Sequence, residues 1–380
     1  MIDAVARRAA GKTRVARAPR LVVALLATAA LASGCADRGD TAGFAARAAS
    51  ELRATDIAAR LGIQQPSRTF QRGAWSEFYF DPAAEQAICL DGSEFQVNVR
   101  HGTSSDVLLY LQGGGACWDY QSCYVEQRAL MKANGALPIG ALDVDDPASP
   151  FKDWNIVYVP YCDGSIYGAD TTVDYDGVRT FHHGLWNLSV AVDAITREFP
   201  QASRIVVSGS SAGGYGTVPG YAVTRVAFPD TPIDVFDDSG PALENQSGIA
   251  NAALRAANWR AAEHYPASCA ECGQHGLYLL DWALGRDTRL RVALYSYLRD
   301  GTIMSFFEWD QATYRNLLLS VTGEIHDRHP ERFERYFVDA MGHTILQFGA
   351  FYTQTVDGVR VADWTQAFLD GSDAWRDVVQ

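Results

Sequence analysis

Three short apolar runs, each followed by glycines or turn residues, constrain the fold of this chain more than any other feature. They occupy residues 107–111, 156–159 and 205–208. Residues 184–199, between the last two runs, place apolar side chains at helical spacing. Apolar runs of this length are typical of strands buried in a parallel sheet, and helices connect such strands and cover the sheet. The sequence therefore predicts an α/β fold with a mostly parallel central sheet flanked by helices.

Two further apolar runs, at residues 233–236 and 290–295, add strands to the same predicted sheet. The chain has 380 residues, enough for one large α/β domain. Its sequence shows no internal repeat and no change of composition that would mark a second domain. We expect one catalytic domain over residues 66–380, preceded by a tether and a lead-in helix over residues 35–65.

The first 34 residues have the layout of a signal peptide. A basic stretch up to Arg20 is followed by the apolar residues 21–32, a run too short to span a bilayer as a stable anchor. Residues 31–35 resemble a bacterial lipoprotein box, which would make Cys35 the lipidated first residue; plain secretion after a nearby cleavage is the alternative. We expect an exported protein, either an outer-membrane lipoprotein or a periplasmic or secreted one, that meets a membrane only through a lipid anchor at Cys35.

The formal net charge of −13 restricts the partners of the chain. The first 34 residues contain six basic residues and one acidic residue, so the part from Cys35 onward is more negative still. Such a surface would repel nucleic acid and anionic membrane faces. We expect no nucleic-acid partner, and we expect the chain to act as a monomer.

Six cysteines remain when Cys35 is set aside for lipidation. An even number in an oxidising compartment indicates disulfides, although six cysteines allow fifteen pairings. The Cys-x-x-Cys segment at residues 269–272 is also half of a zinc site, but the sequence contains no second such segment to complete one. We expect no metal, and sequence proximity suggests three pairs, Cys117 with Cys123, Cys269 with Cys272, and Cys89 with Cys162.

The third apolar run leads directly into Gly209-Ser210-Ser211-Ala212-Gly213. A Gly-x-Ser-x-Gly match is weak by itself in a glycine-rich chain. Here a strand precedes it and a helical stretch, residues 215–227, follows it, which is the context of a sharp turn that exposes a serine oxygen. We predict that Ser211 is a nucleophile; the alternative is a glycine-serine loop that only turns the chain.

A second glycine-rich segment, residues 112–117, follows the first apolar run. Acyl transfer needs donors that point at the oxyanion of the tetrahedral intermediate, and glycines let a loop present bare N–H groups. We predict an oxyanion hole made by the N–H groups of Gly114, Gly115 and Ala212. A phosphate-binding loop is the competing interpretation, but no Gly-Lys-Ser/Thr follows these glycines.

The base should be a histidine after Ser211 if the catalytic order is serine, acid, histidine, as in α/β hydrolases. His343 is the best candidate, because it is expected in a turn after a helix and opens an apolar segment. The acid should follow a strand, and spacing alone does not separate Asp300 from Asp237 and Asp238. The other histidines after the motif are His264 and His275, which flank the Cys-x-x-Cys segment, and His326 and His329, which lie in a charged helical stretch.

Further segments accompany these motifs in a fixed order: residues 109–117 with Cys123, 153–155, 159–162, 209–214, 238–240 and the aromatic strand that ends at Asp300. Together they resemble the pectin acetylesterase and Notum family of serine carboxylesterases, in the α/β-hydrolase superfamily. The resemblance implies that Asp300 is the acid, with Asp238 in a supporting position, and that His343 is the base.

Two positions depart from that family. In its plant and animal members a cysteine lies beside the histidine, whereas Gly342 and Thr344 flank His343 here. Gly115 replaces a bulkier residue found in some members. Members remove acetyl groups from pectin or longer acyl groups from other carriers, so the resemblance leaves the acyl group of the substrate open.

We therefore expect an exported serine carboxylic-ester hydrolase, an O-deacetylase or deacylase that forms a covalent acyl-enzyme and needs no cofactor. Its partner would be an ester substrate, either an acylated carbohydrate or a small acyl ester. Two alternatives stay open: an acyltransferase with the same catalytic residues, and a surface-tethered binding lipoprotein that keeps the fold without catalysis. Four aromatic residues are candidates to line a sugar or acyl site, with ordinary packing as the alternative for each: Trp118, Tyr120, Tyr167 and Trp186.

Overall fold

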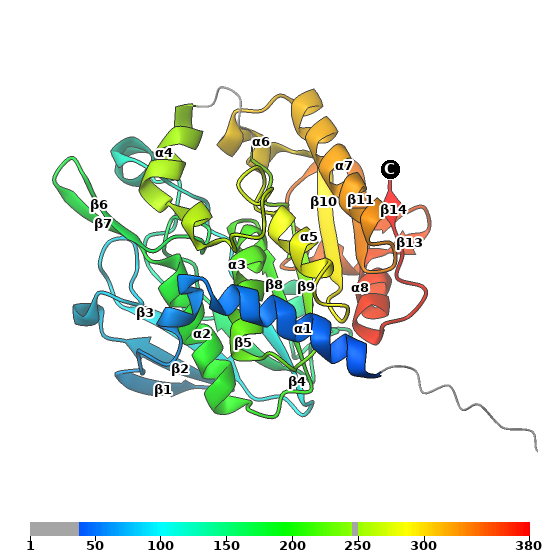
Figure 1. Ribbon diagram of the computed structural model, residues 1–380, viewed down its shortest axis with the longest axis horizontal. Coiled ribbons are helices and arrows are strands. Elements are labelled where there is room, and N and C mark those ends of the chain that lie inside the picture. Colours follow the sequence, from blue (N-terminus) through cyan, green and yellow to red (C-terminus); the bar gives the residue numbers. More distant parts are fainter. Residues whose placement is uncertain (1–37, 245–249) are drawn as a thin grey trace, which may run out of the picture. The chain divides into compact units, whose positions relative to one another are not determined.

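The computed structural model describes residues 38–244 and 250–380 (Figure 1). The predicted signal peptide, residues 1–34, and the predicted lipidation site Cys35 lie outside the described residues. Residues 39–380 cluster into one compact unit. Among the described helices, none has the length and apolar character that a bilayer crossing requires. The domain boundaries at residues 35 and 66 stay predictions.

A ten-stranded sheet forms the centre of the described unit, in the order β1-β2-β3-β5-β4-β8-β9-β10-β11-β14. The strands from β5 to β14 pair in parallel, and β1, β2 and β3 extend one edge in antiparallel fashion. Their bounds are β1 Arg68–Arg72, β2 Trp75–Phe80, β3 Phe95–Arg100, β4 Asp106–Leu111, β5 Asn155–Val159, β8 Arg204–Ser210, β9 Ile233–Asp238, β10 Val292–Asp300, β11 Phe333–Gly342 and β14 Val378–Val379.

The apolar runs in the sequence become the middle of this sheet. Residues 107–111, 156–159, 205–208 and 233–236 lie inside β4, β5, β8 and β9. The run at 290–295 enters β10, which begins at Val292 and continues to Asp300. The mostly parallel α/β fold is confirmed. Two small hairpins lie outside the sheet, β6 (Thr171–Tyr175) with β7 (Val178–His182) and β12 (Thr355–Val356) with β13 (Val359–Arg360).

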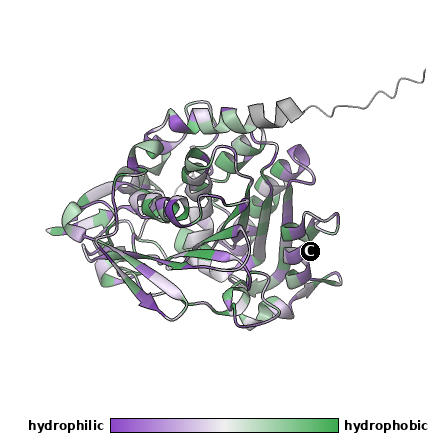
Figure 2. Cartoon of the chain, turned by 90° about the horizontal axis from the view of Figure 1, so that it is seen from below, coloured by the Kyte–Doolittle hydropathy of each residue, from purple (hydrophilic) through white to green (hydrophobic). Residues whose placement is uncertain are grey.

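Helices cover both faces of the sheet because alternate strand residues point to opposite sides. Leu109 of β4 packs in the cluster that contains residues of α1, α2, α3, α5 and α7, whereas its neighbour Tyr110 packs on the other side with α8. Figure 2 shows hydrophobic residues along the strands between these layers. The helices are α1 Arg38–Arg53, α2 Gly184–Glu198, α3 Ala212–Ala227, α4 Ala250–Trp259, α5 Tyr278–Leu284, α6 Gly301–Phe307, α7 Gln311–Arg328 and α8 Val361–Asp370.

Three disulfides link the described residues, as expected for a protein that folds in an oxidising compartment. They join the same pairs that sequence proximity suggested, Cys89–Cys162, Cys117–Cys123 and Cys269–Cys272. The first closes a long stretch with a sequence separation of 73, and the other two close short turns. The long link joins the segment before β3 to the segment after β5.

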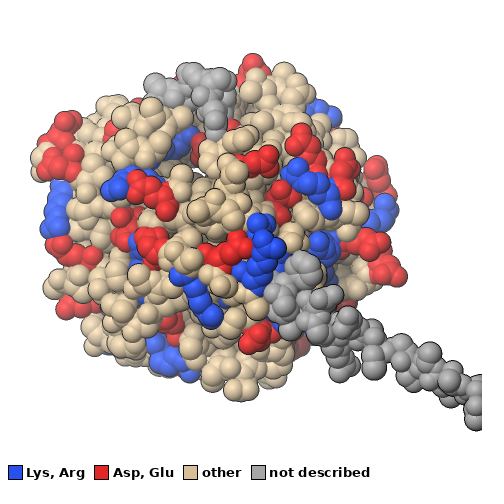
Figure 3. Space-filling model, viewed as in Figure 1, with Lys and Arg blue, Asp and Glu red and all other residues tan. Residues whose placement is uncertain are grey.

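Acidic and basic side chains are interspersed over the face of the molecule shown in Figure 3. Some of them form exposed ion pairs, such as Arg260 with Glu263 at 2.6 Å. Exposed pairs of this kind contribute little to stability, at most about 1 kcal/mol each.

Candidate active site

Ser211 lies at a sharp turn between β8, which ends at Ser210, and α3, which begins at Ala212. Its backbone has φ 58° and ψ −120°, a conformation that residues with a side chain rarely adopt. The turn is crowded: a Cβ at Gly213 would lie 1.9 Å from the carbonyl oxygen of Leu111. Only glycine fits there, so the tight turn that holds the strained Ser211 requires the glycine of the motif at position 213.

The helix after Ser211 directs the positive end of its dipole at the serine. Ser211 is the N-cap of α3, a 16-residue helix whose positive end therefore points at the serine. The backbone N–H of Ser211 donates to the carbonyl oxygen of Asp238 on the neighbouring strand at 2.8 Å. The elbow is thus fixed to β9 as well as to its own helix.

The predicted oxyanion loop lies beside this elbow because β4 and β8 are parallel neighbours, with Leu111 opposite Gly209. Among the described residues, the N–H groups of Gly114, Gly115 and Ala212 have no hydrogen-bond acceptor and stay open to a ligand. Gly115 has φ +83°, and a Cβ there would collide with the carbonyl oxygen of Arg128. Gly115, Ser211 and Ala212 line one cavity together, whereas Gly114 is not among its lining residues.

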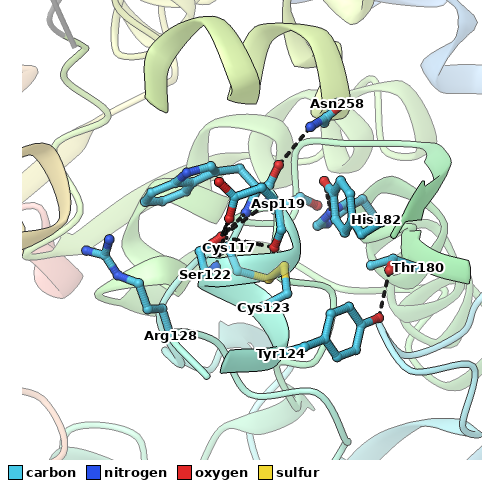
Figure 4. Close-up of a disulfide and its surroundings, with 12 residues drawn as sticks. Cys117, Asp119, Ser122, Cys123, Tyr124, Arg128, Thr180, His182 and Asn258 are labelled. Carbon is cyan, nitrogen blue, oxygen red and sulfur yellow. Dashed lines mark hydrogen bonds between the residues drawn. A yellow bond between two sulfur atoms is a disulfide. The ribbon is translucent and has the colours of Figure 1, made fainter. Parts of the chain in front are cut away.

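A disulfide holds the segment that follows the oxyanion loop (Figure 4). Cys117 and Cys123 bracket a turn in which the Ser122 hydroxyl donates to the Asp119 carboxylate at 2.6 Å. From α4, the side-chain amide of Asn258 donates to the carbonyl oxygen of Trp118 at 2.7 Å, as Figure 4 shows for Asn258. The segment that follows the oxyanion loop is therefore held by a disulfide and by a hydrogen bond from α4.

Asp300 and His343 meet because β10 and β11 are parallel, with Asp300 opposite Gly342. Nδ1 of His343 lies 2.7 Å from Oδ2 of Asp300. The other carboxylate oxygen of Asp300 accepts the N–H groups of Thr302 and Ile303, both at 3.0 Å, which fixes the carboxylate at the start of α6. The aspartate is fully buried. This arrangement orients the imidazole ring and favours one tautomer.

Nε2 of His343 is buried and has no hydrogen-bond partner among the described residues. The described atoms also show no hydrogen bond between Ser211 and His343. Hydrogen bonds of this kind often form only when a ligand is bound. The expected setting of His343 was wrong in one respect: it follows the strand β11, Phe333–Gly342, and not a helix.

The buried carboxylate of Asp238 connects the serine side to the histidine side. It accepts the Ser210 hydroxyl at 2.6 Å and the N–H groups of Ile345 and Leu346 at 2.9 and 3.0 Å. Next to it, the Ser239 hydroxyl accepts the N–H of Thr344 at 3.1 Å. Burial raises the pKa of Asp238 to about 6, against the lowering effect of these hydrogen bonds. Asp238 thus clamps the loop that carries His343.

The remaining candidate residues lie away from Ser211 or serve other contacts. Asp237 is buried and accepts the N–H of Gly240 at 2.7 Å; burial raises its pKa well above the usual range. Four histidines have other polar partners: His264 with Asp56, His275 with the N–H of Glu244, His326 with the carbonyl of Phe333, and His329 with Asp281.

A small cavity of about 30 Å³ lies against Ser211. Its wall is aromatic and aliphatic apart from the serine and one cation, Arg255. Of the four aromatic candidates from the sequence, Trp118 lines this cavity and the other three do not. Side chains that come from α4 and α6 could not be named from the residue pattern, because a helix that follows a long connection carries no local signal of what it faces. The missed lining residues are Arg255, Trp259, Ile303, Phe306 and Phe307.

One group of described residues has the composition of a metal site. Ligand atoms of His326, Glu334 and Asp377 lie within 4.8 Å of one another. Asp377 is already held by the Arg335 guanidinium at 2.6 Å, and burial raises the pKa of Glu334 to about 7. These residues belong to α7, β11 and the segment before β14, apart from the cavity that contains Ser211.

Comparison with known proteins places the chain near a group of esterases. The profile of the family described as Pectinacetylesterase matches residues 76–265. Pectin acetylesterase 4 of Arabidopsis thaliana is 30% identical over 169 residues, which are 40% of this chain and 41% of that protein. Pectin acetylesterase 11 of the same plant is 26% identical over 205 residues, 49% of this chain and 52% of that protein.

Other relatives are named for a different esterase activity. Human palmitoleoyl-protein carboxylesterase NOTUM is 27% identical over 175 residues, 42% of this chain and 35% of that protein. The chain therefore spans about half the length, or less, of the curated relatives it matches. The profile match includes Ser211 and the glycine-rich loop, and it ends before Asp300 and His343.

Proposed function

We propose, because the chain belongs to the pectinacetylesterase family, that it is an exported serine carboxylic-ester hydrolase that removes short acyl groups such as acetyl. One observation carries the proposal. The strained Ser211 lies in the same small cavity as Gly115 and Ala212, and the buried Asp300 at the end of β10 is hydrogen-bonded to His343, which directly follows β11. The alcohol part of the ester substrate would be a carbohydrate or another small alcohol.

The proposed reaction has two acyl-transfer steps. Oγ of Ser211 attacks the ester carbonyl while Nε2 of His343 takes the hydroxyl proton. The N–H groups of Gly114, Gly115 and Ala212 stabilise the oxyanion, and the alcohol leaves with the proton from His343. Water then attacks the acyl-enzyme with the same histidine as base, which releases the acid and restores the serine.

Asp300 keeps the imidazole in the tautomer that this reaction needs. Its Oδ2 accepts the Nδ1 proton, so Nε2 is left free to accept the proton of Ser211. As the histidine becomes positively charged, the buried carboxylate stabilises it. No metal or cofactor enters any of these steps.

The size of the cavity supports a short acyl group. About 10–15 Å³ of such volume holds one water molecule, so 30 Å³ holds a group the size of an acetyl methyl and little more. The named activities of the relatives differ on this point, since some are pectin acetylesterases and others palmitoleoyl-protein carboxylesterases. The small cavity supports the former activity for this chain.

Export is part of the proposal. Three disulfides fit an oxidising compartment, and the first 34 residues have the composition of a signal peptide. Lipidation at Cys35 would attach the protein to a membrane, and plain secretion would release it. Metabolic labelling with a fatty acid separates the two, because Cys35→Ala abolishes the label only in a lipoprotein.

The test of the serine mechanism uses a fluorophosphonate probe and p-nitrophenyl acetate. We expect the probe to label the wild-type protein, and Ser211→Ala to lose the label and at least about 10⁴-fold in kcat. Ser210→Ala is the matched control for labelling, since its hydroxyl is buried against Asp238. If the wild-type protein stays unlabelled and inactive, the proposal that it is a serine esterase is wrong. Transfer of acetyl to an added alcohol in preference to water would identify an acyltransferase.

A further inference from the structure

A second, much larger cavity adjoins the one that contains Ser211. Its volume is about 540 Å³, against about 30 Å³ for the first. A volume of this size is typical of sites that hold a whole small molecule. The two cavities share a wall, made by the residues that line both: Ile166, Tyr215, Arg255 and Trp259.

We infer that Arg255 is the specificity-determining residue of this wall, which limits the acyl group of the substrate to a short chain by closing the passage into the large cavity. The inference rests on the proposed function, because it concerns the acyl side of the same site. Arg255 extends from α4 and is almost completely buried, with a side chain 6% exposed. It is a cation in an otherwise apolar wall.

Several contacts hold the guanidinium in that position. It donates to Glu244 at 2.6 Å and to Asn251 at 2.5 Å. Aromatic rings surround it, with the guanidinium carbon 4.8 Å from the ring centre of Phe307 and 5.6 Å from that of Trp118. Charge, hydrogen bonds and cation–π contacts all favour the closed position.

The other shared side chains have their own anchors. The indole N–H of Trp259 donates to the carbonyl oxygen of Cys117 at 3.0 Å. The ring of Tyr215 stacks on Phe307 with centroids 6.0 Å apart. The N–H of Ile166 is held by the Tyr161 hydroxyl at 3.0 Å. Shortening Arg255 therefore leaves the rest of the wall in place and removes only the part between the cavities.

A longer acyl chain would have to displace this guanidinium. Displacement would separate the buried guanidinium of Arg255 from the carboxylate of Glu244, which is costly because a buried charge without its partner is poorly solvated. An acetyl group makes no such demand. The wall thus discriminates by chain length, and the cavity behind it stays inaccessible to the substrate.

The experiment compares p-nitrophenyl acetate, butyrate, octanoate and laurate on three proteins. Arg255→Ala should raise the ratio of kcat/KM for octanoate to that for acetate by about tenfold or more, since added methylenes can then reach the apolar part of the large cavity, which Val218, Pro219 and Trp259 line. Arg255→Met keeps the length of the side chain without its charge. It should raise the ratio by less than Arg255→Ala does, because it still fills the space, but its displacement no longer separates a charge from Glu244.

A further variant keeps the inference testable if the loss of Arg255 disturbs folding. Arg255→Ala combined with Glu244→Gln removes the carboxylate that would lose its partner, and it should show the same change of ratio. Adding Ala252→Phe, which fills the large cavity from α4, should return the ratio toward the wild-type value.

The outcomes separate this inference from the proposed function. If the wild-type protein hydrolyses acetate and all Arg255 variants keep its chain-length profile, the inference is overturned and the hydrolase stands. The inference is overturned in the same way if Arg255→Met changes the ratio as much as Arg255→Ala does. If no ester is hydrolysed and Ser211 is not labelled, the proposed function itself is wrong.

Discussion

The two sides of the candidate site are held by different kinds of interaction. On the nucleophile side, steric crowding at Gly213 and the Cys117–Cys123 disulfide fix the elbow and the oxyanion loop. On the histidine side, the loop after β11 has no disulfide, and the carboxylate of Asp238 and the hydroxyl of Ser239 hold it. The family match covers the first side and stops before the second.

The difference shows where a small change can disable the site. Crowding and covalent bonds tolerate the loss of a single hydrogen bond, whereas a clamp made by one carboxylate does not. The histidine side should therefore be the more sensitive of the two to conservative substitutions. Four predictions test this comparison.

The largest effect is expected at Asp300. Asp300→Asn keeps the cap of α6, because asparagine caps helices as well as aspartate does, but it places an amide against Nδ1 of His343. The histidine then loses the required tautomer, and we expect kcat to fall about 10³- to 10⁴-fold. Steady-state hydrolysis of p-nitrophenyl acetate measures this. Asp310→Asn, at the cap of α7, is the matched control and should leave kcat unchanged. A fall in kcat of less than about tenfold in Asp300→Asn would contradict the proposed role of Asp300 as the acid that orients His343.

The second prediction concerns Asp238. Asp238→Asn replaces an acceptor of two backbone N–H groups with an amide that has one acceptor atom, so the loop around His343 loosens. We expect kcat to fall about 10- to 100-fold with a smaller change in KM, as for the loss of one hydrogen bond to a charged group. Asp237→Asn is the control, because Asp237 is equally buried and has no hydrogen bond to this loop. Equal losses in both variants would show a merely structural effect.

The same variant has a pH signature. Because the pKa of folded Asp238 is raised to about 6 from an unfolded value near 3.9, the folded state binds the proton more tightly. Its stabilising contribution is full below pH 4 and is lost as the pH rises through 6. The stability of the wild type relative to Asp238→Asn should therefore fall by about 2 kcal/mol between pH 4 and pH 7. Urea unfolding at the two pH values measures it, and a rise with pH would contradict the assignment.

The smallest effect on catalysis is expected from the disulfide. Cys117→Ser with Cys123→Ser should lower the free energy of unfolding by about 2 kcal/mol, as expected for a short closed loop. The hydrogen bonds from Asn258 and Ser122 remain, so kcat should change less than it does in Asp238→Asn. Urea midpoints and kcat give both values. A larger loss of kcat than in Asp238→Asn would reverse the comparison.

The nucleophile side was predictable because its signals are local. An apolar run, a glycine pattern and a following helix all lie within about 25 residues of Ser211. The histidine side depends on long-range pairing. β11 escaped prediction because residues 333–342 mix charged and apolar side chains, and only its parallel register with β10 brings Asp300 opposite Gly342. The family resemblance selected Asp300, which spacing alone had not separated from Asp237 and Asp238.

The small cavity beside Ser211 was the least predictable part. Trp118 follows the oxyanion loop directly and could be named from the sequence, but Arg255 and Phe307 come from helices in other parts of the chain. Nothing in the spacing of α4 indicates that its single cation, Arg255, turns inward. Only the three-dimensional packing shows that it faces the serine.

The clamp at Asp238 has a consequence for how the protein matures. A chain made from its N-terminus produces Ser211 and both glycine-rich segments well before residues 344–346, which complete the clamp. Until those residues are made, the loop that carries His343 lacks its hydrogen bonds to Asp238 and Ser239. Under the proposed function, an unfinished chain would therefore contain Ser211 without a positioned base, and ester hydrolysis would begin only after residues 344–346 had joined the fold.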